Sequence, residues 1–117
     1  MTDRIYDLND RTVEFAKRVR RFVKNLKKTI ANIEDGKQVI KSSGSVGANY
    51  REANEALSKK DFLMRIKICR KEAKESEYWL SLIDTEGDSE LEQERIALKA
   101  EALELVKIFN SIIQKSS

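Results

Sequence analysis

Residues 58–83 read SKKDFLMRIKICRKEAKESEYWLSLI, and this stretch decides the fold class. Its apolar and small residues recur at alternating steps of four and three, at Phe62, Ile66, Cys69, Ala73, Ser76, Leu80 and Ile83. Such a regular heptad seam lies on one face of an α-helix and is typical of helices packed nearly parallel to one another. Ser58 and Asp61 have the Ser-x-x-acid spacing of an N-terminal cap. The stretch therefore predicts a long amphipathic helix over residues 59–84.

Three further segments of the chain show the helical period. In the first, apolar residues recur from Val13 to Ile30, with Asn9 or Asp10 as the expected cap and a break near Ala31–Asn32. The last segment follows a turn at residues 85–89 (TEGDS). Proline is absent from all 117 residues, so long helices meet little interruption. The period predicts helices over residues 9–29, 32–57, 59–84 and 89–115.

Residues 42–48 (SSGSVGA) have the composition of a loop, because serine and glycine favour turns. The alternative is a continuous helix whose small residues let a neighbouring helix approach closely. The spacing 39-43-46-50-53-57 runs through the segment without a change of phase, which favours the helix.

Four amphipathic helices of similar length with short connections bury their apolar faces best against one another. The sequence therefore predicts an all-α fold, an antiparallel up-down-up-down four-helix bundle, with residues 1–117 as a single domain.

Composition argues against catalysis. Histidine is absent, which removes Ser-His and Cys-His pairs, histidine metal sites and the commonest proton shuttle at neutral pH. The acids Glu92, Glu94, Glu101 and Glu104 fall mainly off the apolar seam, so a metal site in the bundle is not expected. Cys69 lies on the seam, where a buried thiol is expected. We expect no enzyme activity and no cofactor.

The chain shows neither a signal peptide nor a transmembrane segment, which indicates a cytoplasmic protein without membrane contact.

Positive charge is concentrated in the first half of the chain. Residues 1–60 carry a net charge of +6, and residues 61–117 carry −3. The densest cluster of basic residues lies within residues 17–28, which contain no acid: Lys17, Arg18, Arg20, Arg21, Lys24, Lys27 and Lys28. Such a cluster is either a solvated helix face or a surface that binds polyanions. Further candidates for phosphate contacts are Lys41, Arg51, Lys59 and Lys60.

Five other residues are candidates for structural contacts within the bundle or between subunits. Asn49 and Glu52 lie at one edge of the second apolar stripe, where hydrogen bonds could fix how two helices or two subunits align; simple surface exposure is the alternative. Glu72 and Glu75 lie beside the seam and are expected to pair with Lys or Arg. Trp79 lies off the seam, where it either widens the core or covers an interface.

Three segments carry a family resemblance. The stretch SGSVGANYREA at residues 43–53, followed by Ser58 and Phe62, resembles the signature of the bacterial four-helix-bundle family of 23S rRNA intervening-sequence proteins. EAKESEYWL at residues 72–80 is similar to the third helix of that family, and RTVEFA at residues 11–16 is similar to its first. Related bundles include the accessory proteins of diversity-generating retroelements.

The resemblance implies a homopentamer with a basic surface that binds nucleic acid. The leading hypothesis is thus a non-enzymatic, oligomeric protein that binds rRNA or other RNA or DNA without strong sequence specificity. The alternative is an interaction adaptor, such as an accessory subunit of a reverse transcriptase.

Overall fold

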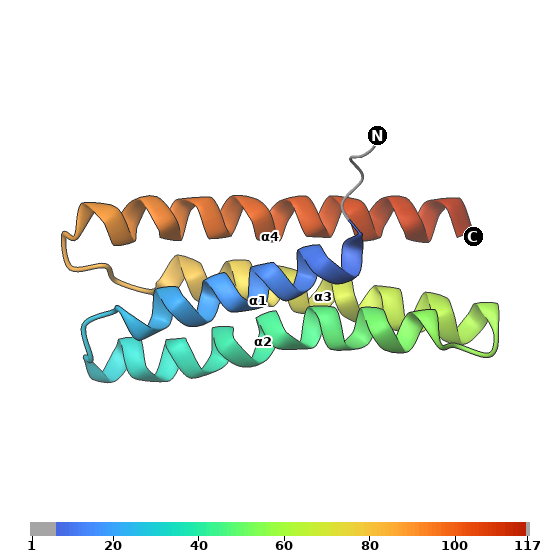
Figure 1. The fold of residues 1–117 in the computed structure, drawn as a ribbon, viewed down its shortest axis with the longest axis horizontal. Coiled ribbons are helices and arrows are strands. Elements are labelled where there is room, and N and C mark those ends of the chain that lie inside the picture. The colour runs from blue at the N-terminus through green and yellow to red at the C-terminus, as the bar shows by residue number, and fades with distance from the viewer. Residues whose placement is uncertain (1–6, 117) are drawn as a thin grey trace.

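Four helices account for nearly all of residues 7–116, the part of the chain that the computed structural model describes (Figure 1). Helix α1 spans Leu8–Lys24, α2 spans Ile30–Asn54, α3 spans Lys59–Leu82 and α4 spans Ser89–Ser116. Consecutive helices run in opposite directions, and short loops join them (Figure 1). The predicted all-α, up-down-up-down bundle is confirmed. No helix within residues 7–116 is long and apolar enough to cross a membrane.

The helix starts follow from side-chain caps. The hydroxyl of Ser58 accepts a hydrogen bond from the backbone N–H of Asp61 at 3.1 Å, which confirms the predicted cap of α3. The carboxylate of Asp88 accepts from the N–H of Leu91 at 3.0 Å and caps α4 in the same way.

The predicted course of the first helix is wrong at both ends. Asp7, rather than Asn9 or Asp10, caps α1 by accepting from the N–H of Asn9 at 2.9 Å. At the other end α1 stops at Lys24, five residues before the predicted end. There the side-chain amide of Asn25 donates to the carbonyl of Arg21 at 2.9 Å, and Leu26 turns into the core.

The second helix begins earlier than expected because Thr29 caps it, accepting from the N–H of Asn32 at 3.1 Å. The predicted break near Ala31–Asn32 is therefore wrong, and the real loop covers residues 25–29. Ile30, assigned by its period to the first stripe, is 85% exposed. Leu57 is also exposed, because α2 ends at Asn54.

Buried residues from all four helices form one core. The seam of α3 is confirmed at Ile66, Cys69, Ala73, Ser76 and Leu80, all fully buried. The helices occupy four corners, with α1 opposite α3 and α2 opposite α4. Helix α1 packs closely against α2 and touches α4 less extensively.

Residues 42–48 are helical, as the unbroken period predicts, and their small side chains permit close helix packing. A Cβ atom on Gly47 would lie 2.8 Å from the hydroxyl oxygen of Thr12 in α1. The hydroxyl groups of Ser42 and Ser76 form a buried hydrogen bond of 2.8 Å between α2 and α3. The SSGSVGA segment therefore contacts two neighbouring helices.

Candidate nucleic-acid interface

The seven cations between residues 17 and 28 divide into two groups. Five of them lie on α1, and Lys27 and Lys28 lie in the loop that follows. The expected acid-free surface is only partly present, because three of the seven have carboxylate partners: one on α4, one in the α3–α4 loop and one on α1 itself.

Arg18 is the most strongly neutralised of the three. Its guanidinium donates two hydrogen bonds of 3.2 Å to the carboxylate of Glu94 on α4. Arg21 pairs with Glu14 at 3.1 Å, and Lys27 pairs with Glu86 at 3.6 Å. The side chains of Arg21 and Lys27 remain mostly exposed, and surface pairs of this kind contribute about 1 kcal/mol or less. The structure thus removes Arg18 from the expected phosphate-binding set but leaves Arg21 and Lys27 open to solvent.

Lys17, Arg20 and Lys24 share the outer face of α1 and are exposed; we call these three residues the cationic face. Within residues 7–116, none of the three forms an ion pair. Arg20 donates to the backbone carbonyl of Ala16 at 3.2 Å and extends over Gly44 of α2.

Lys28 has a local structural role. Its ammonium group donates to the carbonyls of Lys24 and Leu26, at 3.1 and 3.3 Å, and so satisfies acceptors at the C-terminal end of α1. A cation at this end also interacts favourably with the helix dipole.

The remaining predicted cations do not join the cationic face. Lys41 lies on the side of α2 that faces α3, near enough to Glu72 to affect its pKa. Lys59 and Lys60 are exposed in the first turn of α3, at the opposite end of the bundle from Lys27 and Lys28 (Figure 1). The 25 residues of α2 separate the two ends by about 37 Å. Arg51, in the last turn of α2, is exposed near the same distant end.

The structural candidates have different environments. The side-chain oxygen of Asn49 accepts from Arg65 at 3.0 Å, which links α2 to α3. Glu52 is exposed, and no hydrogen bond of its side chain is found within residues 7–116. The carboxylate of Glu75 lies 4.0 Å from the ammonium nitrogen of Lys71. Partial burial, together with the nearby charge of Glu75, raises the pKa of Glu72.

Trp79, expected either to widen the core or to cover an interface, and Cys69, expected to be buried, are both placed by the structure. Trp79 packs partly against the core and meets Tyr78 edge to face, with ring centroids 5.1 Å apart. Cys69 is buried as expected, and burial raises the pKa of its thiol to about 12. The thiol therefore stays protonated and unreactive at neutral pH. No group of three His, Cys, Asp or Glu side chains within residues 7–116 could hold a metal ion.

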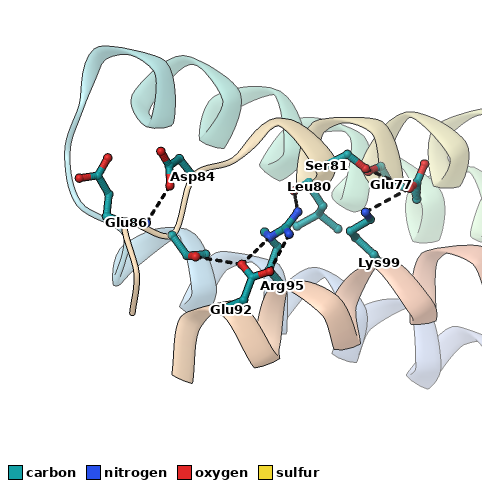
Figure 2. A network of polar contacts seen from close by, with 9 residues as sticks. Glu77, Leu80, Ser81, Asp84, Glu86, Glu92, Arg95 and Lys99 are labelled. Atoms are coloured by element: carbon teal, nitrogen blue, oxygen red, sulfur yellow. Dashed lines mark hydrogen bonds and ion pairs between the residues drawn. The ribbon is translucent and has the colours of Figure 1, made fainter. Parts of the chain in front are cut away.

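Sequence reasoning missed the polar network where α3 meets α4 (Figure 2). Arg95 donates two hydrogen bonds to Glu92, at 2.7 and 2.9 Å, and a third to the backbone carbonyl of Leu80 at 3.1 Å. Thr85 also donates to Glu92 at 2.9 Å. The bonds from Arg95, and then that from Thr85, lower the pKa of Glu92 to about 2. The only sequence signal was the three-residue spacing of an acid and a base, which is common on exposed helices.

Comparison with known proteins gives one consistent family. The model of the 23S rRNA-intervening sequence protein family matches residues 6–111. The chain belongs to this family. A solved structure of a protein of unknown function from the S23 ribosomal protein family of Bacteroides thetaiotaomicron is 34% identical, with a TM-score of 0.78. The similarity covers 90% of this chain and 96% of that one. No functionally curated protein matches the chain. Membership of the intervening-sequence family confirms the resemblance seen in the sequence but assigns no activity.

Proposed function

We propose that this member of the intervening-sequence family is a non-enzymatic, oligomeric, cytoplasmic protein that binds nucleic acid through phosphate contacts. One observation carries the proposal: Lys17, Arg20 and Lys24 are exposed together along α1, and none has a carboxylate partner within residues 7–116. Cations left open in this way can replace the counterions of a nucleic-acid backbone. No module that reads base edges is present in the described helices, so we expect little sequence specificity.

Oligomerisation strengthens the electrostatic argument. One chain carries a formal charge of only +3, whereas the pentamer that the family resemblance implies would carry +15. It would also present five copies of the cationic face. Several weak contacts on one polyanion raise the overall affinity through their high effective concentration.

Charge reversal of two residues on the cationic face tests the proposal. The double variant Lys17→Glu and Lys24→Glu should weaken binding of a fluorescent RNA by about tenfold or more at low salt. It should also reduce the slope of log affinity against log salt by about two, because two phosphate contacts are lost. Fluorescence anisotropy at several salt concentrations measures both quantities.

The matched control reverses Lys67 and Lys74, which are exposed on α3 with the same seven-residue spacing. Both double variants change the net charge equally. The proposal fails if the wild-type protein does not bind RNA or DNA at low salt. The assignment to α1 fails if both double variants weaken binding to the same extent.

A further inference from the structure

A cleft of about 380 Å³ lies where the C-terminal turns of α1, the 25–29 loop and the first three turns of α2 meet. It adjoins the cationic face, since Arg20 and Lys24 contribute to its wall. The residues that line it are Arg20, Val23, Lys24, Leu26, Lys27, Lys28, Asn32, Ile33, Lys37 and Ile40.

The floor of the cleft is aliphatic. Val23, Leu26, Ile33 and Ile40 supply it. Leu26 belongs to the bundle core, Val23 and Ile40 pack against it, and Ile33 is 40% exposed. Covering such an apolar surface with a flat, weakly hydrated group lowers the free energy, because it removes apolar area from water. Phosphate contacts alone make no use of such a floor.

The rim of the cleft is cationic, and among residues 7–116 no acidic side chain lines it. Lys37 pairs with Glu34 at 3.4 Å outside the cleft, and both side chains are exposed. Arg20 and Lys24 have no such partner within the described chain. Arg20 and Lys24, one helical turn apart on the α1 wall, therefore match two negative charges that flank an apolar ligand group.

Asn32 also lines the cleft, and its side-chain amide bonds to the backbone of two loops. It donates to the carbonyls of Lys27 and Asp84, at 3.1 and 2.9 Å, and accepts from the N–H of Asp84 at 3.2 Å. Both amide donors are thus used, and the side chain is buried, so Asn32 is not available to read the edge of a base. A ligand group held here would be recognised by its apolar face and by its flanking charge.

We propose that the cleft holds an unpaired nucleotide of a single-stranded nucleic acid. The base covers the floor at Ile33, and the flanking phosphates contact Arg20 and Lys24. In a duplex the bases are stacked and paired inside the helix, so only a single strand can present a base to the floor and phosphates to the rim together. An acidic amphipathic helix fits less well, because it needs a long open groove for successive anchors and the 25–29 loop closes one end of this cleft. This inference rests on the proposed function and names its preferred substrate.

The test uses the full chain, with the variant Ile33→Ser and the matched control Ile30→Ser. Ile30 lies one helical turn away, is highly exposed and does not line the cleft.

Fluorescence anisotropy compares a labelled single-stranded RNA with a duplex of the same sequence at one salt concentration. The wild-type protein should prefer the single strand. Ile33→Ser should weaken that binding about fivefold without changing the salt slope, whereas Ile30→Ser should change it less than twofold. Neither variant should affect duplex binding, and thermal unfolding verifies that both remain folded.

The outcomes separate this inference from the proposed function. Equal affinity for the two nucleic acids, together with no effect of Ile33→Ser, would overturn the inference but leave phosphate binding intact. Absence of any binding at low salt would overturn both. A labelled peptide rich in Glu and Leu that binds instead of the single strand, and is weakened by Ile33→Ser, would assign the cleft to an acidic helix. A lower mass of the Ile33→Ser variant in light scattering would assign it to a second copy of the chain.

Discussion

At the residue scale, Asn32 joins two loops that are distant in the sequence. Its side chain bonds to the backbone of Lys27 in the α1–α2 loop and to that of Asp84 in the α3–α4 loop. The residue is buried, so these backbone groups have little access to water if the amide is removed. Unpaired buried polar groups are costly, which makes this single side chain important for the end of the bundle.

We therefore expect Asn32→Ala to lower the free energy of unfolding by about 2–4 kcal/mol. The control Asn54→Ala changes an exposed asparagine in the last turn of the same helix and should cost less than about 0.5 kcal/mol. Urea denaturation of the three proteins measures the difference. Equal stability of the two variants would show that the bridge contributes little.

Glu92 makes stability depend on pH in the acid range. Its pKa is lowered from 4.5 to about 2 in the folded protein, so folding favours the ionised carboxylate. This contribution is complete above pH about 4.5 and is lost as the pH falls towards 2. Glu92→Gln should reduce the loss of stability over this window.

The control for this prediction is Glu90→Gln, which removes an exposed acid from the same first turn of α4. It should retain the acid sensitivity of the wild-type protein. Urea denaturation at pH 5, 4 and 3 gives the comparison. If Glu92→Gln loses stability with pH as steeply as the wild type does, the bonds from Arg95 do not carry the effect.

At the element scale, the glycines of α2 explain how α1 packs against it. A Cβ atom on Gly36 would lie 2.8 Å from a methyl group of Val23, and one on Gly47 would lie 2.8 Å from the hydroxyl of Thr12. Glycine inside a helix costs about 1 kcal/mol relative to alanine. At Gly36 and Gly47 this cost is accompanied by a close approach of α1 to the backbone of α2. At Gly44 a Cβ would meet only the end of the long Arg20 side chain, at 3.4 Å.

Alanine at Gly44 and alanine at Gly47 should change the stability of the protein in opposite directions. Gly44→Ala should stabilise the protein by about 0.5–1 kcal/mol through helix propensity. Gly47→Ala should destabilise it by about 1–3 kcal/mol, because α1 must shift to relieve the contact with Thr12. Thermal and urea unfolding of both variants measure the signs. Stabilisation by Gly47→Ala would show that α1 moves away from α2 at little cost.

The extent to which the elements could be predicted depends on what terminates them. Helix α3 was predicted within two residues, because Ser58 and the heptad seam are both local signals. The end of α1 was missed, because the apolar period continues through Leu26 to Ile30 while the chain turns at Asn25. Leu26 is buried from the loop rather than from a helix, and a periodic pattern cannot separate these two situations.

At the scale of the whole molecule, exposed apolar residues on the outward faces of α3 and α4 support self-association. Ile96 and Leu103 on α4 are 56% and 46% exposed and lie seven residues apart. Tyr78 and Leu82 on α3 are also exposed, one turn apart. Large apolar side chains in such rows commonly mark an interface between subunits.

We expect the double variant Ile96→Glu and Leu103→Glu to lower the mass of the assembly, towards that of a single 13.5 kDa chain. Burying two unpaired carboxylates in an interface is strongly unfavourable. Light scattering measures the mass, and circular dichroism verifies the helices. Gln93→Glu, an exposed control on the same helix, should leave the mass unchanged. A wild-type protein that is already a monomer would contradict the proposed assembly.

Sequence periodicity by itself determined that the chain forms four helices packed as a bundle, because the position of an apolar residue within a helix reports directly which face is buried. The charges in the sequence located the cationic cluster, and the motifs at residues 11–16, 43–53 and 72–80 carried the resemblance to the family. Only the tertiary structure decided which cations remain available. Glu94 neutralises Arg18 from 76 residues away, and Glu86 pairs with Lys27 through a loop at the same end of the bundle. The apolar cleft beside the cationic face likewise exists only once α1 and α2 pack together. Pairing of charges depends on distance in space, and a local pattern in the chain carries no information about the segment that folding will place beside it.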